Sequence, residues 1–396
     1  MLAVEAWVAQ ESSFAADPSA SGASGYAALH TLEAISMHKV GRKNFDAPYG
    51  INRLRKVQKR VGPDGAELSV KLPLKGLAAS AGESVAPGAL DFLDFVLAAA
   101  FGAGTNVTGI GAASVTSTLF TQQTGDTVNV DDALCIYESG QNSNRPQWRV
   151  IDTEGVAGQY TVRTLAGTFT TAAISFGYRH YTPAVVPAVA NGNSLAMYLE
   201  LAGGSQWTLL GGRPSSFKLS MDAGGEASLD VTLMFDRRVR GSKASIPAVT
   251  AFAPPSIVGE LSSFLWGTTE YETEKIEVEW TLGTADRKAT SGANGRGNIL
   301  ARSADMKVTV VPPFGTNWED DFDATTARRL ELVLGNNAFA ASLVNSCFLY
   351  SPACNAAAID YVDSNNEPRQ AMQFESIDAG YNAIPALRPY WRLCRA

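Results

Sequence analysis

The chain of 396 residues is poor in the side chains that most often catalyse reactions or bind metals. It has three histidines and four cysteines, and none of them lies in an HxH, HExxH or CxxC motif. The GxSxG motif, which carries the nucleophilic serine of many serine hydrolases, is also missing. The sequence therefore predicts no catalytic residue, no cofactor and no metal site. The cysteines, which lie in apolar or terminal contexts, are predicted to be buried thiols, although a bond between Cys347 and Cys354 stays open.

Long hydrophobic runs and a strong charge imbalance are missing as well. The run at residues 95–101 is too short to span a bilayer, and the start of the chain has Glu5 and no basic region, so we expect neither a membrane segment nor a secretory signal. We expect synthesis in the cytoplasm. The net charge of −7 argues against a protein that coats DNA.

A few weak motif matches have ordinary explanations. Residues 36–39 match SxxK by chance, because the companion motifs are missing. Residues 109–114 resemble a dinucleotide-binding loop but follow a polar stretch instead of an apolar strand. Residues 292–297 have no Walker lysine, and the acidic residues at 319–323 suit the first turn of a helix.

Two alternating stretches are the strongest structural signal. Residues 275–282 and 306–310 place apolar and polar side chains in alternation, which predicts strands with one apolar and one charged face. With 36 glycines and 18 prolines, the chain is expected to be mainly β with few helices.

The order of these signals predicts an arm, two domains and an insert. Residues 1–28 form a flexible arm, 29–245 a first domain and 256–396 a second. A helix is predicted at about 87–101, with Pro87 in its first turn and Gly102 ending it. Short strands at about 119–183 predict a small β-barrel inserted in the first domain. Both domains have an alternating strand, a helix and a final hairpin in the same order, which predicts an architectural repeat.

One segment is strongly basic. Residues 39–60 contain Asp46 and eight basic residues: Lys39, Arg42, Lys43, Arg53, Arg55, Lys56, Lys59 and Arg60. It is either a solvated basic hairpin or a contact for an acidic surface of another copy of the chain.

Several stretches together resemble a known family. They are residues 10–18 (QESSFAADP), 210–226 (LGGRPSSFKLSMDAGGE) followed by 229–235, and 278–283 (VEWTLG) followed by 306–311 (MKVTVV) and 330–335. In this order the chain resembles the major tail tube proteins of long-tailed, siphovirus-like bacteriophages, of the type with a duplicated domain. The insert, at 125–128, also resembles small barrels that these proteins carry.

The resemblance implies a structural virion protein of the phage tail without enzymatic activity. Two tail-tube-type β-sandwich or barrel domains would join their sheets across subunits. Three copies would form a ring of pseudo-sixfold symmetry, and stacked rings would form a conduit through which DNA passes without specific binding. Terminator, tape measure and distal tail proteins are the implied partners.

In such a tube, Glu277 and Glu279 are candidates for the lumen and the eight basic residues for contacts between rings. Two other classes stay open: a capsid-decoration or host-surface adhesion protein, and a β-rich hydrolase. The hydrolase would need convergent carboxylates or histidines, which the sequence does not display.

Overall fold

The two alternating stretches form neighbouring antiparallel strands in the computed structural model of the chain, as predicted. They are β22 (Lys275–Lys288) and β23 (Arg296–Val311), and Val278 lies directly opposite Val308. Ile276, Val278 and Trp280 are buried on one face, whereas Glu277 and Glu279 point to the other. Burial of one face therefore sets the register of this pair.

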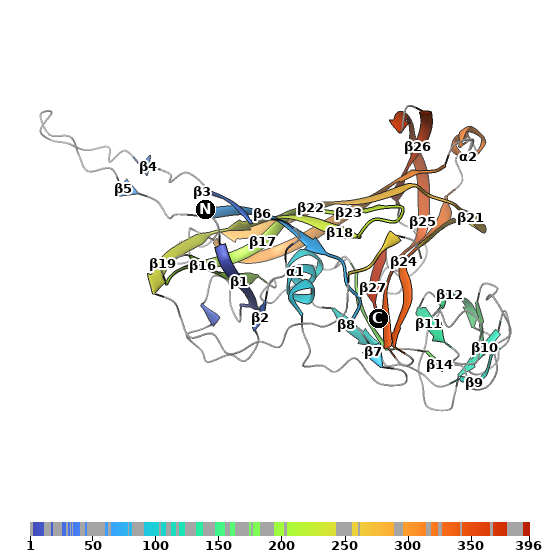
Figure 1. The fold of residues 1–396 in the computed structure, drawn as a ribbon, viewed down its shortest axis with the longest axis horizontal. Helices are drawn as coiled ribbons and strands as arrows, with labels where there is room; N and C mark the ends of the chain where they lie inside the picture. Colours follow the sequence, from blue (N-terminus) through green and yellow to red (C-terminus); the bar gives the residue numbers. More distant parts are fainter. Residues whose placement is uncertain are drawn as a thin grey trace, which may run out of the picture.

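The structure describes the following residues: 3–11, 17–18, 26–28, 31, 33, 35–39, 44–45, 60–61, 65–77, 79–80, 91–102, 104–107, 112–115, 119–122, 132–137, 147–154, 159–162, 174–175, 177–182, 194–201, 204–242, 256–259, 262–288, 296–313, 318–323, 327–340, 343–364, 367–377 and 391–396. The fold is mainly β, and the paired strands are antiparallel (Figure 1).

The elements of the first part of the chain, besides those of the insert, are β1 (Ala3–Gln10), β2 (Tyr26–Ala28), β3 (Ser36–Lys39), β4 (Asn44–Phe45), β5 (Arg60–Val61), β6 (Ala66–Pro73), β7 (Ala79–Ser80), α1 (Phe92–Phe101), β8 (Thr105–Val107), β15 (Tyr178–Tyr181), β16 (Leu195–Leu201), β17 (Ser205–Asp222), β18 (Ser228–Phe235) and β19 (Arg237–Ser242). The second part adds β20 (Ser263–Trp266), β21 (Thr269–Tyr271), β22, β23, α2 (Glu319–Asp323), β24 (Arg328–Ala340), β25 (Leu343–Ser364), β26 (Glu367–Ser376) and β27 (Arg392–Arg395).

Two sets of strands in the large sheet are paired in the same order. In the first set, β3 pairs with β6, β6 with β18, β18 with β17, β17 with β16, and β16 with β1. In the second set, β22 pairs with β23, β23 with β26, β26 with β25, β25 with β24, and β24 with β20. β17 also pairs with β22, so the two sets form one continuous sheet.

The longest strands each belong to two parts of the sheet. β17 pairs with β16 and β19 along its first part and with β18 and β22 along its second. The change occurs near Gly211, whose φ of 69° is left-handed, and Gly212, where a Cβ would lie 2.3 Å from the Phe235 ring and 2.6 Å from the Leu195 carbonyl oxygen. Glycine is therefore required at this bend.

Helix α1 packs against the apolar side of the sheet and is buried along its whole length. Phe101 at its end contacts the rings of Phe217, Trp280 and Trp391. The helix ends at Gly102, as predicted, but its predicted start near Pro87 is wrong. Asp91 is the N-cap, and its side chain accepts a hydrogen bond from the Asp94 amide (2.8 Å).

The prediction of a flexible arm is wrong for residues 3–10, which form β1 in the large sheet and pair with β16. The acidic residues at 319–323 form the short helix α2, and the predicted final hairpins form as β17–β18 and β25–β26. Among the described helices, neither is long and apolar enough to cross a membrane.

A separate small sheet extends from residue 112, before the predicted start of the insert at about 119, to residue 175. Its strands are β9 (Ala112–Val115), β10 (Leu119–Gln122), β11 (Ala133–Tyr137), β12 (Gln147–Glu154), β13 (Gln159–Val162) and β14 (Ile174–Ser175), in the order β14-β11-β12-β13-β10-β9. Among the described residues no pairing closes this sheet into a barrel. Trp148 connects it to the large sheet by stacking on Phe348 and donating a hydrogen bond to Ser346 (2.8 Å).

Candidate functional site

The polar face of the large sheet carries a row of side chains that alternate in charge. Directly opposed residues in six adjacent strands form this charged row: Lys71 (β6), Asp230 (β18), Lys218 (β17), Glu279 (β22), Lys307 (β23) and Glu375 (β26). Opposite charges in directly facing positions stabilise a strand pair by roughly 0.2–1 kcal/mol each. Three lysines and three carboxylates leave the row without net charge.

Lys218 lies at the centre of the closest ion pairs on this face. Its Nζ is 2.9 Å from Glu277 Oε2 and 3.3 Å from Glu279 Oε1, and Lys275 Nζ is 2.9 Å from Glu277 Oε1. Both glutamates predicted to face a lumen are thus held by lysines from neighbouring positions. The face is not purely acidic here, because each of these carboxylates has a cation within 4 Å.

The pKa values of Glu277 and Lys218 show that their ion pairs outweigh the effect of burial. Burial alone raises the pKa of Glu277, but hydrogen bonds from Lys275 and Lys218 outweigh it and hold the pKa below its ordinary value. Burial lowers the pKa of Lys218, whereas its bonds to the two glutamates bring the pKa above its ordinary value. Both groups therefore stay charged at neutral pH.

The face is slightly hollowed where four strands meet. Polar side chains of β6, β18, β17 and β22 line a shallow depression, with Glu33 at its edge beside Lys71. Lys71 Nζ lies 3.1 Å from Glu33 Oε1, which raises the pKa of Lys71.

The basic segment predicted to contact another ring lies mostly outside the described residues. Lys39 ends β3 and Arg60 begins β5. The other six candidates are outside: Arg42, Lys43, Arg53, Arg55, Lys56 and Lys59.

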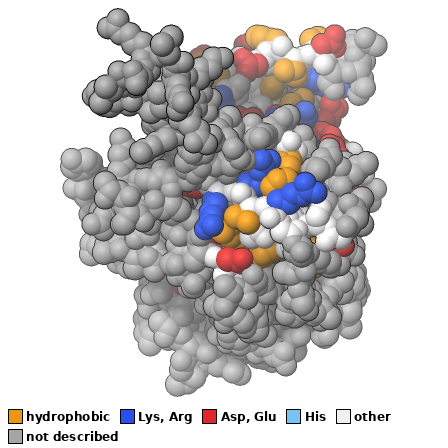
Figure 2. Space-filling view, turned by 90° about the vertical axis from the view of Figure 1, so that its left-hand side faces the viewer, with side chains coloured by type: hydrophobic (Ala, Val, Ile, Leu, Met, Phe, Trp, Pro, Cys, Tyr) orange, Lys and Arg blue, Asp and Glu red, His pale blue; other side chains and the backbone are white. Residues whose placement is uncertain are grey.

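A second basic surface, which sequence reasoning did not single out, lies on β19. The Arg238 guanidinium carbon is 4.3 Å from the centroid of the Trp207 ring, and that of Arg240 is 5.9 Å away. β19 lies toward the left-hand side of the molecule in Figure 1, and basic and hydrophobic side chains lie side by side on this side in Figure 2.

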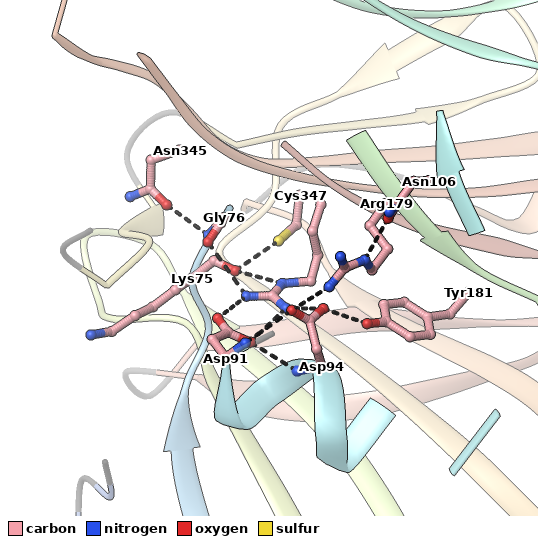
Figure 3. A network of polar contacts seen from close by, with 10 residues as sticks. Lys75, Gly76, Asp91, Asp94, Asn106, Arg179, Tyr181, Asn345 and Cys347 are labelled. Carbon is pink, nitrogen blue, oxygen red and sulfur yellow. Dashed lines mark hydrogen bonds and ion pairs between the residues drawn. The ribbon is translucent and has the colours of Figure 1, made fainter. Parts of the chain in front are cut away.

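A buried ionic network, shown in Figure 3, joins the last strand to the start of α1. Arg395 is fully buried, and its Nη2 donates to Asp91 Oδ2 (2.6 Å) while its Nη1 donates to Asp94 Oδ1 (2.8 Å). Arg179 Nη1 lies 2.7 Å from Asp94 Oδ2, and the Tyr181 hydroxyl donates to Asp94. Two arginines thus balance two carboxylates, as a buried cluster of charges requires.

The same arginine also binds the chain after β6. Arg395 Nε donates to the Lys75 carbonyl oxygen (2.9 Å), and the Gly76 amide donates to Asn345 Oδ1 (2.7 Å). Burial alone raises the pKa of Asp94, but Arg395 and Arg179 hold it below its ordinary value. The network therefore ties β27, β15, α1 and the end of β6 together and supports the sheet from its apolar side.

Within the described residues no group of three or more histidine, cysteine or acidic side chains is placed to hold a metal ion. The family comparison decides the identity: a model described as phage tail tube protein matches residues 58–378. The chain belongs to the phage tail tube protein family. A search of curated proteins gave no match.

Membership of the tail tube family explains why the polar surfaces are paired charges and not a catalytic site. The chain is a structural component of the phage virion tail, it is not an enzyme, and it assembles with other tail proteins into the tube. The match extends from before Lys71 to beyond Glu375, so every member of the charged row lies inside it, whereas Arg395 lies outside.

Sequence reasoning singled out one of the six residues of the charged row, Glu279, together with Glu277, which lies beside the row and pairs with Lys218. It missed the other five, because strand partners far apart in the chain cannot be read from alternation: Lys71, Asp230, Lys218, Lys307 and Glu375. It also missed Asp91 and Asp94, although their spacing before an apolar run is a capping signal.

Proposed function

We propose that the chain is a duplicated-domain tube subunit of a long-tailed phage, and that three copies close a ring of pseudo-sixfold symmetry. One observation supports this most: the two strand sets have the same pairing order and share a bulge at an equivalent place. In the first set β17 has a bulge between Pro214 and Ser216, opposite β18. In the second set β25 has a bulge between Ala356 and Ala358, opposite β26. Three chains with two such sets would supply six similar units.

The proposed domains are 29–245, with a small barrel at about 119–183, and 256–396. The segment 1–28 precedes them and adds β1 to the sheet of the first domain. β17 and β22 pair from Ser216 to Asp222, so the proposed domains would share one sheet, as they would in a ring wall. Each half would be a sandwich or barrel once its outer edges are paired.

The polar face is proposed to line the lumen, with Glu277 and Glu279 near its middle. The opposite face is covered by α1 and the core, so it is unsuited to a water-filled conduit. DNA phosphates bind free lysine ammonium groups. Because Lys218 and Lys275 are already held by carboxylates, the face would offer DNA little to bind and would let it slide.

Electron microscopy of the purified protein tests the ring. We expect tubes of uniform width whose averaged rings contain three chains and six similar units. Rings of six chains would overturn the proposed duplication, and compact particles without a channel would overturn the proposed ring.

The contact between rings is tested separately. The eight basic candidates lie in one segment, so the triple charge reversal Arg53→Glu, Arg55→Glu and Lys56→Glu is expected to block stacking while single rings still form. Unchanged tube formation would reject the basic segment as a ring contact.

A further inference from the structure

The polar face of the sheet is formed by eight strands in the order β3-β6-β18-β17-β22-β23-β26-β25, so β3 and β25 lie at its two ends. In the part of the chain that the structure describes, β3 pairs with β6, and residues 358–363 of β25 pair with β26. Neither stretch has a second strand beside it there. Unpaired edges of this kind invite another strand, and proteins otherwise cover or interrupt them.

The chain contains a template for the missing contact, because β17 and β22 are the strands that join the two sets. Their register is regular: Lys218 lies opposite Glu279, Leu219 opposite Val278 and Ser220 opposite Glu277. On the polar face the first set begins with β3 and ends with β17, and the second set begins with β22 and ends with β25. β3 is therefore equivalent to β22, and β17 to β25.

The two sets can be aligned residue by residue through their pairings. One row of the first set runs Met37, Leu68, Leu233, Pro214, and one row of the second runs Val278, Val308, Phe374, Ala356. Both rows end at the residue before a bulge, Pro214 in β17 and Ala356 in β25, so the two rows are equivalent and Val278 corresponds to Met37. Counting along each strand from these two residues, Leu219 in β17 corresponds to Tyr361 in β25.

We propose that β25 pairs antiparallel with β3 of a second copy of the chain, in the register that β17 and β22 use within one copy. Tyr361 then lies opposite Met37 of the second copy, Asp360 opposite His38 and Val362 opposite Ser36. This inference rests on the proposed ring, because it names the edges and the register by which the ring closes.

The exposure of the two corresponding side chains fits this contact. Leu219 is 0 % exposed, with Val278 of β22 directly beside it and the core packed over its face. Tyr361 is 71 % exposed and is the most exposed large hydrophobic side chain among the described residues. The Tyr361 hydroxyl donates to Glu319 (3.1 Å), which holds the ring over α2. A second copy would bury the ring beside Met37, which packs at the edge of the core. Burial of an aromatic side chain is a large favourable term at interfaces.

Disulfide cross-linking in assembled tubes tests the register. The four native cysteines are buried, so they contribute little background. We expect the double variant Tyr361→Cys with Met37→Cys to form intermolecular disulfides that end in a band of three linked chains. The control Val362→Cys with Met37→Cys is shifted by one residue, which puts the two thiols on opposite faces, and it should cross-link far less.

The outcomes separate this inference from the proposed ring. Stronger cross-linking of the control pair would overturn the register, and three-chain rings without either cross-link would overturn the choice of edges. A band of six linked chains would support the edges but overturn the three-copy ring. Should the variants not fold, hydrogen exchange of the unaltered protein decides: amides at 36–39 and 358–363 must exchange more slowly in tubes than in free subunits, and unchanged rates in either stretch would overturn the contact.

Discussion

Replacing Arg395 by methionine removes the centre of the buried ionic network and should strongly destabilise the subunit. Arg395 makes five hydrogen bonds to Asp91, Asp94, Lys75 and Gly76. Methionine keeps a long apolar chain but leaves two buried carboxylates with Arg179 as their remaining arginine. Breaking a buried ion pair by removing one partner costs about 3–5 kcal/mol. That is a large share of a typical domain stability of about 5–15 kcal/mol.

Urea unfolding of free subunits, followed by tryptophan fluorescence, measures this loss. The matched control is Arg237→Met, because Arg237 is exposed on β19 and such surface changes stay within about 0.5 kcal/mol. If Arg395→Met and Arg237→Met unfold at the same urea concentration, the network does not stabilise the fold and the reasoning is refuted.

The pH dependence of this difference has a defined sign. The pKa of Asp94 is lowered in the folded protein, so its contribution is complete above the unfolded value of about 3.9. It is lost as the pH falls through the lower folded value. In Arg395→Met the buried Asp91 and Asp94 carboxylates lack the arginine that lowers their pKa values, so they take up protons at a higher pH than in the unaltered protein. The stability gap between the two proteins should therefore narrow as the pH falls from neutral. A gap that widens in acid would contradict this assignment.

Two further predictions concern the bend and the thiols. Gly212→Ala should destabilise the subunit by about 1–3 kcal/mol, because the new Cβ meets the Phe235 ring and the Leu195 carbonyl oxygen. Gly241→Ala is the control, because a Cβ there enters open space. Equal unfolding midpoints for the two variants would contradict this packing. Burial raises the pKa of Cys347 and Cys354 to about 12, so a thiol reagent at pH 8 should label them only after unfolding, and rapid labelling of the folded subunit would show that these sites are open.

The elements that sequence reasoning predicted correctly are those whose signals are local. Alternation revealed β22 and β23 because strand side chains repeat every two residues, and Gly224 marked the turn between β17 and β18 with its φ of 71°. The start of α1 was missed because Pro87 is a plausible first-turn residue, although Asp91 and Asp94 form the capping box. Strand β1 was missed because an alanine- and serine-rich neighbourhood hid it.

By itself, the sequence determined the mainly β fold and the charged and apolar faces of β22 and β23. It also indicated the tail tube family, which the family match confirms. Composition, period and turn residues carry this information, and each acts over a few neighbouring residues. The tertiary structure alone decided which charges meet. Lys71 and Glu375 stand in one row, and Arg395 binds Asp91 304 residues away. Such partners depend on strand order and register, which follow from burying the whole apolar face at once and not from any single stretch.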